Sequence, residues 1–153
     1  MIYSIAAIIL LVVFSGYFSA TETAFTSLNK IRIKNMANDG DRRARNVMEL
    51  AENYDNLLST ILVGNNLVNI MLSSISTVLF IGLYPNYGAT IATAVATIVV
   101  LIFGEISPKS LAKENPEKFA MFSAPFIRAL VVVLTPVNWI FSMWKRFLAK
   151  IFN

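Results

Sequence analysis

The sequence VVLIFGEISPKSLAKE, residues 99–114, passes within a few positions from apolar residues to a carboxylate, a proline and a lysine. No charged side chain occurs between residues 56 and 104, so Glu105 is the first charged group after a long apolar region. In a membrane protein such a residue is costly and marks an ion or substrate path. Whether the chain lies in a membrane is therefore the first question.

The chain of 153 residues is 56% hydrophobic and 14% charged. Soluble domains carry about 25% charged residues, so this composition predicts a membrane protein. Cysteine and histidine are absent, which excludes disulfides, thiol chemistry and imidazole catalysis. With no nucleophile–base pair or catalytic carboxylate pair, an enzyme is the least expected class. The net charge of +4 comes from basic residues beside apolar runs, which favours an anionic membrane face over nucleic acid as partner.

Three apolar runs approach or exceed the roughly 20 helical residues that cross a bilayer. They cover about residues 2–28, 57–83 and 89–104. The uncharged sequence YPNYG, residues 84–88, forms a turn between the second and third runs. The sequence therefore predicts an all-α membrane protein with three transmembrane helices, the last two forming an antiparallel pair.

Residues 29–56, between the first two runs, form a polar segment rich in basic residues. These are Lys30, Arg32, Lys34, Arg42, Arg43 and Arg45. The positive-inside rule makes this segment cytoplasmic, which places the N-terminus outside and the C-terminus inside. The sequence NDGD, residues 38–41, is a turn signal that divides the segment into two short helices.

The remaining residues, about 109–153, are apolar enough to include a fourth span, but three features oppose it. Arg128 would lie in the bilayer at a cost of about 2.5 kcal/mol or more. Pro125 and Pro136 each interrupt a straight helix. A crossing would also place the basic C-terminal residues outside. We expect bent juxtamembrane helices along the inner interface, anchored by tryptophan and lysine side chains.

Two serines stand out in the first predicted span. Ser15 and Ser19 lie one helical turn apart, and Glu22 follows three residues later on the same face. Serines also pack helices closely and bond to their own backbone, so packing alone is an alternative explanation. Glu22 is a candidate for a second ion or an entry path, or a simple carboxylate at the helix end.

The second span contains three asparagines in the sequence GNNLVN, residues 64–69. Asn65 and Asn69 share a helix face, whereas Asn66 points about 100° away from Asn65. Asparagines at membrane depth either hydrogen-bond between helices or bind a ligand. The residues alone leave both alternatives open.

The third span ends at Gly104 and Glu105. In an α-helix Pro108 has no N–H to donate to the Gly104 carbonyl, so we expect a helix break that offers that carbonyl beside the Glu105 carboxylate. The alternative is that Glu105 marks the end of the span and pairs with Lys109 four residues later. Together with the serines and asparagines these groups are hard oxygen donors, which suit Mg²⁺, Ca²⁺ or Na⁺.

Three motifs carry a family resemblance: FSGYFSATETAFTSLNKIRIKNMA, LLSTILVGNNLVNIMLSS and FGEISPKSLAKENPEKFA. In this order, over nearly the whole chain, they resemble the transmembrane domain of the CNNM/CorC magnesium transporters. The resemblance implies a homodimer and Mg²⁺ export from the cytoplasm across the cell membrane, driven by Na⁺ influx. When the motifs are matched, the resemblance implies that the metal ligands are Ser15, Ser19, Asn65, Asn69, the Gly104 carbonyl and Glu105.

Members of this family continue into a cytoplasmic pair of CBS domains that bind ATP, so the resemblance implies that such a regulatory domain follows these residues. Nothing within residues 1–153 supports ATP binding. We weigh the exporter against a membrane module that senses Mg²⁺ and regulates another transporter without transport of its own. An ion channel is a third possibility, which a dependence of flux on a Na⁺ gradient would argue against.

Overall fold

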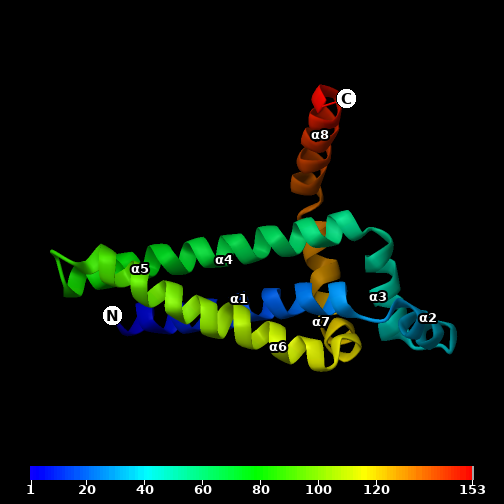
Figure 1. The fold of residues 1–153 in the computed structure, drawn as a ribbon, viewed down its shortest axis with the longest axis horizontal. Coiled ribbons are helices and arrows are strands. Elements are labelled where there is room, and N and C mark those ends of the chain that lie inside the picture. Colours follow the sequence, from blue (N-terminus) through cyan, green and yellow to red (C-terminus); the bar gives the residue numbers. More distant parts are fainter. Residues whose placement is uncertain (153) are drawn as a thin grey trace. The chain divides into compact units, whose positions relative to one another are not determined.

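The computed structural model describes residues 1–152, and these form helices and connecting turns without strands. The predicted all-α architecture is confirmed. In chain order (Figure 1), the elements are α1 (Ile2–Ser27), α2 (Lys30–Asn38), α3 (Arg42–Glu52), α4 (Tyr54–Leu83), α5 (Gly88–Val99), the π-helical segment η1 (Val100–Ile106), α6 (Ser107–Glu114), α7 (Pro116–Val133) and α8 (Thr135–Phe152).

Three helical runs are long and apolar enough to cross a membrane: α1, α4, and the continuous run Gly88–Glu114 that joins α5, η1 and α6. They correspond to the three predicted spans. The third differs from the prediction, because the helix does not break after residue 104. It changes from α to π hydrogen bonding at Val100 and returns to α at Ser107.

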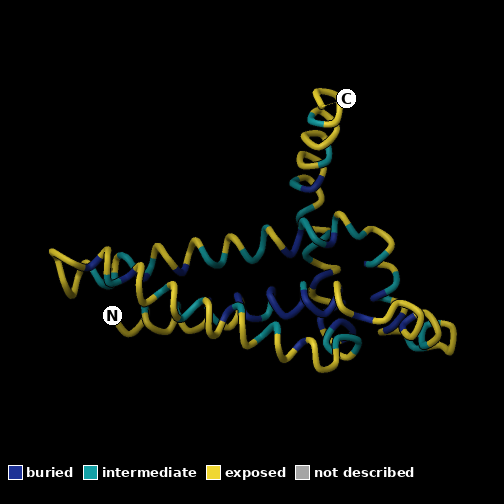
Figure 2. Tube along the Cα trace, viewed as in Figure 1, coloured by how far each residue is buried: buried dark blue, intermediate teal, exposed yellow. Residues whose placement is uncertain are grey.

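The first compact unit comprises residues 1–28 and 62–120. In it α1 packs against η1 and α6, and it contacts the part of α4 that follows residue 62 (Figure 1). Burial is concentrated in the second half of α1, where Ser15 and Ser19 are fully buried, while most of its first ten residues are exposed (Figure 2). The polar half of α1 is thus held among the other helices of this unit.

The turn between α4 and α5 depends on a close backbone approach. A Cβ on Gly88 would lie 2.5 Å from the backbone of Ile81, so only glycine allows α5 to start this close to the end of α4. This contact fixes the two helices as the antiparallel pair that the sequence predicts.

The second compact unit comprises residues 29–61 and those from 121 onward. Its polar segment folds into α2 and α3, as the turn signal predicts. Asn29 and Asp41 cap the two helices by accepting hydrogen bonds from backbone N–H groups of the first turn. Gly40 adopts a φ of +98°, which the turn between them requires.

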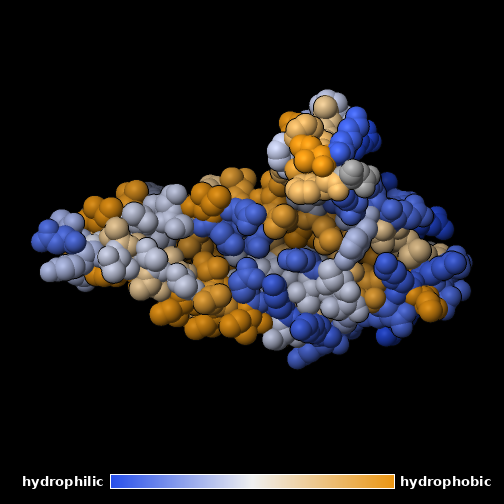
Figure 3. Space-filling view, turned by 45° about the horizontal axis from the view of Figure 1, so that its top comes forward, coloured by the Kyte–Doolittle hydropathy of each residue, from blue (hydrophilic) through white to orange (hydrophobic). Residues whose placement is uncertain are grey.

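Helices α7 and α8 meet at a bend of 70°. Two ion pairs join them to the polar segment and the start of α4: Arg128 lies 3.0 Å from Glu49 of α3, and Lys145 lies 3.0 Å from Asp55. Helix α8 is amphipathic, with apolar and hydrophilic side chains on opposite sides (Figure 3). Taken together, the bent pair is also long and apolar enough to count as a fourth span.

Candidate cation site

A hydrogen-bonded chain of side chains links α1 and α4 inside the first unit. The Ser15 hydroxyl donates to Asn69 Oδ1 at 2.7 Å, and Asn69 Nδ2 donates to Asn65 Oδ1 at 3.5 Å. Ser15 is fully buried, the two asparagines are half-buried, and Asn66 is exposed. The structure therefore brings together three of the predicted ligands and separates Asn66 from them, as the helical phase predicts.

Gly104 meets this cluster from η1. A Cβ at this position would lie 2.8 Å from the Ser15 hydroxyl, which is closer than side chains tolerate. One residue along α1, a Cβ on Gly16 would lie 3.0 Å from the ring of Pro108 and 3.1 Å from the Phe103 carbonyl oxygen. The two glycines let α1 and η1 approach until Ser15 touches the π-helical backbone.

The π-helical segment changes which carbonyl loses its partner. The Ser107 N–H donates to the Ile102 carbonyl, five residues back. In this register the next donor is residue 108, a proline, and its missing N–H would have bonded to the Phe103 carbonyl. The sequence argument assumed α spacing and assigned the loss to Gly104. The register shifts it by one residue, so Phe103 is a carbonyl that sequence reasoning missed.

Ser19 occupies the same face of α1, one turn beyond Ser15. It is fully buried, and its hydroxyl has no hydrogen-bond partner in the part of the chain that the structure describes. A buried hydroxyl without a partner costs about 1–3 kcal/mol and calls for an explanation such as an unseen ion or water. Ser19 is therefore the clearest sign of a missing polar ligand in α1.

Glu105 pairs with Lys109: Lys109 Nζ lies 3.1 Å from Glu105 Oε2. Both side chains are partly exposed, 26% for Glu105 and 40% for Lys109. Glu105 directly follows Gly104 in η1, but no hydrogen bond joins its carboxylate to the Ser15–Asn69 pair among residues 1–152. Glu22, near the C-terminal end of α1, is half-buried.

The donor set is chemically narrow. Within the described residues no group of three or more histidine, cysteine, aspartate or glutamate side chains gathers in one place. The candidate ligands are instead neutral hydroxyl, amide and carbonyl oxygens, with one carboxylate. Such a set suits a hard cation that keeps part of its water shell and disfavours zinc or copper.

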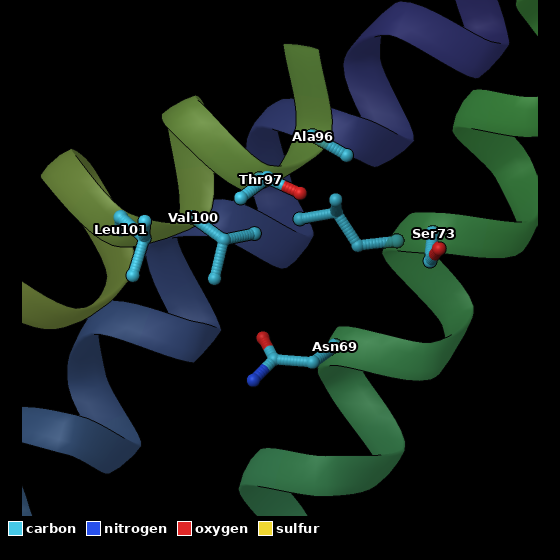
Figure 4. Close-up of a pocket in the computed structure, with 7 residues that line it drawn as sticks. Asn69, Ser73, Ala96, Thr97, Val100 and Leu101 are labelled. Carbon is cyan, nitrogen blue, oxygen red and sulfur yellow. The ribbon is translucent and has the colours of Figure 1, made fainter. Parts of the chain in front are cut away.

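Asn69 also lines a cavity of about 250 Å³ between α4 and the α5–η1 run. Its other walls are Leu72, Ser73, Ala96, Thr97, Val100 and Leu101. Figure 4 shows Asn69 and Ser73 on α4 facing Thr97 on α5 across this space. The same asparagine thus belongs both to the buried cluster and to an open cavity.

The profile of the Cyclin M transmembrane N-terminal domain, CNNM, matches residues 5–153. The chain belongs to the CNNM/CorC family. With its three apolar helical runs, this makes it a multi-pass membrane protein. The family assignment agrees with the resemblance carried by the three motifs.

Relatives of this CNNM-type domain occur in bacteria and plants. It is 40% identical over 136 residues to the UPF0053 inner membrane protein YfjD of Escherichia coli. This alignment covers 89% of this chain and 32% of YfjD. It is 40% identical over 144 residues to a UPF0053 protein of Haemophilus influenzae, covering 94% and 34%. A chloroplastic DUF21 domain-containing protein of Arabidopsis thaliana is 28% identical over 137 residues, covering 90% and 21%. The chain spans about a third of the length of the two bacterial relatives.

Proposed function

We propose that this CNNM-type domain exports Mg²⁺ from the cytoplasm in exchange for Na⁺. The ion path would use Ser15, Ser19, Asn65, Asn69 and the residues of η1, with Glu105 as the charged ligand. The observation that carries the proposal is the unpartnered, fully buried hydroxyl of Ser19. It lies one turn from a serine that already contacts an asparagine and a glycine backbone, which are oxygen donors of the kind Mg²⁺ takes.

The charge of the site suits transient binding. One carboxylate with Mg²⁺ leaves a net charge of +1, which opposes long residence at membrane depth. The same carboxylate with Na⁺ gives a neutral site. A single site that alternates between the two sides of the membrane therefore accepts either ion, and an inward Na⁺ gradient drives exchange.

We assign the cytoplasmic side to the basic segment. Residues 29–56 carry six Lys or Arg side chains, all within α2 and α3, whereas the turn at residues 84–87 carries no charge. The N-terminus then faces outside. Arg128 supports juxtamembrane placement of α7, because it pairs with Glu49 and hydrogen-bonds Asn46 of the polar helix α3.

The protein is proposed to act as a homodimer followed by a CBS-pair regulatory domain. Within the apolar windows of α4 and of the run Gly88–Glu114, 11% of residues are buried inside one chain. The remaining surface is available to lipid and to a second copy. The greater length of the relatives leaves room for a further domain.

Reconstitution of the full-length protein into liposomes tests the function. Mg²⁺ efflux that depends on an opposing Na⁺ gradient, and that Glu105→Ala abolishes, is the expected result. Glu114→Ala is the matched control, because this exposed carboxylate ends α6 nine residues further along and forms no ion pair among residues 1–152. Mg²⁺ binding without flux would indicate the sensing module instead, and flux unchanged in Glu105→Ala would remove Glu105 from the site.

A further inference from the structure

Two hydroxyls in the first unit lie beside the candidate site without a hydrogen bond to the described chain. Most threonines of its helices bond to their own backbone four residues back: Thr21 to Tyr17, Thr26 to Glu22, Thr77 to Ser73 and Thr93 to Ala89. The hydroxyls of Ser73 and Thr97 make no hydrogen bond within the described chain. Both line the cavity beside Asn69.

The cavity starts at the candidate site and extends away from it. Asn69 accepts the hydrogen bond of Ser15 at one end. Ser73 lies one turn beyond Asn69 along α4, toward the turn at residues 84–87. Thr97 lies near the end of α5, seven residues before Gly104, so along the third run it stands between that turn and Gly104. The hydroxyls therefore stand on the side of the site that faces outside in the proposed orientation.

Lipid chains offer no hydrogen-bond partner to the hydroxyls of Ser73 and Thr97. At membrane depth a polar group without a hydrogen bond is costly, so it meets water, an ion or another polar group. A cavity of about 250 Å³ with three polar side chains on its walls has room for several water molecules and enough partners to hold them. A cation that keeps part of its water shell fits the same space.

We propose that this cavity is the outward vestibule of the cation path. A partly hydrated cation released from the Ser15–Asn69 pair would enter it, and Ser73 and Thr97 would replace part of the water shell. The inference rests on the proposed function for the identity of the ion. Beyond that function, it assigns Ser73 and Thr97 to the cation path and places the exit from the site between α4 and α5.

Single cysteines test the vestibule directly, because residues 1–153 contain none. Ser73→Cys and Thr97→Cys are made in the full-length protein, with any cysteine outside these residues removed. Intact cells are treated from outside with a membrane-impermeant, cationic methanethiosulfonate. Val78→Cys and Ile98→Cys are the matched controls, since these apolar positions are 73% and 57% exposed on the same two helices.

The two vestibule thiols are expected to react on the order of tenfold faster than the controls, because a thiol ionises in water and not in lipid. External Mg²⁺ should slow them and leave the controls unchanged. Equal rates at all four positions, or labelling from the cytoplasmic side alone, would overturn the vestibule. Labelling does not require transport, so a loss of Mg²⁺ flux in liposomes is a separate result that bears on the proposed function.

Discussion

Lys109 holds the Glu105 carboxylate through an ion pair of 3.1 Å across one turn of helix. Glu105 is the only acidic residue among the candidate ligands. Within residues 1–152 it belongs to no group of three or more acidic side chains that could bind a metal ion together. Any cation that binds Glu105 therefore competes with an ammonium group already in place. The ion pair therefore lowers the affinity of Glu105 for a cation, and the size of this effect depends on Lys109.

Lys109→Met is expected to raise the affinity for Mg²⁺ about two- to fivefold, because a partly exposed pair of this kind contributes about 0.4–1 kcal/mol. Isothermal titration of the full-length protein measures the change. Lys113→Met, one turn further along α6, is the matched control and should leave the affinity unchanged. An affinity for Mg²⁺ that stays the same or falls in Lys109→Met would show that the lysine does not compete.

Ser19→Ala separates stability from binding. Removing a buried hydroxyl that has no partner should leave the thermal stability equal or higher. Loss of one oxygen ligand should weaken Mg²⁺ binding, by about tenfold if it costs about 1.4 kcal/mol. Ser15→Ala is the comparison, since it breaks the 2.7 Å bond to Asn69 and should lower both quantities. Unchanged Mg²⁺ affinity in Ser19→Ala would leave its hydroxyl without a role.

The membrane helices follow from the sequence because lipid imposes simple requirements. Long uncharged runs, an uncharged turn and a basic segment are enough to place α1, α4 and the run that begins at Gly88. The position of Asn65 and Asn69 on one face of α4 also follows from the helical repeat alone. These features depend on residue type and spacing, which the sequence displays.

The π-helical segment does not follow from the sequence in the same way. The same residue types can form an α-helix, with hydrogen bonds four residues apart, or a π-helix, with hydrogen bonds five residues apart. Here the π-helix occurs where Ser15 closely approaches Gly104 and Gly16 closely approaches Phe103. The unpartnered state of Ser19 likewise depends on what the neighbouring helices leave around it. Both are properties of packing between segments far apart in the chain.

Gly104→Ala should disrupt the contact between α1 and η1. The added Cβ would lie 2.8 Å from the Ser15 hydroxyl, so we expect a loss of about 1–3 kcal/mol in stability and weaker Mg²⁺ binding. Gly82→Ala, with nothing within 4 Å, should be neutral or slightly stabilising. Adding Ser15→Ala to Gly104→Ala removes the hydroxyl that the new Cβ meets, so the double variant should lose less stability than the sum of the two single variants and should still bind Mg²⁺ weakly. A Gly104→Ala protein as stable as the parent would contradict the close approach.

A last prediction concerns the second unit, where Asn138 of α8 donates to the Thr60 hydroxyl of α4 at 3.0 Å and Thr60 donates to the Asn56 carbonyl. Both residues are buried, so Thr60→Val leaves the Asn138 amide without its acceptor and should cost about 1–3 kcal/mol. Thr93→Val is the same substitution at an exposed threonine that bonds only to its own helix, and it should change stability by less than about 0.5 kcal/mol. Thermal unfolding of the two variants in one detergent compares them. Equal losses would mean that the buried bond does not hold α8 against the start of α4.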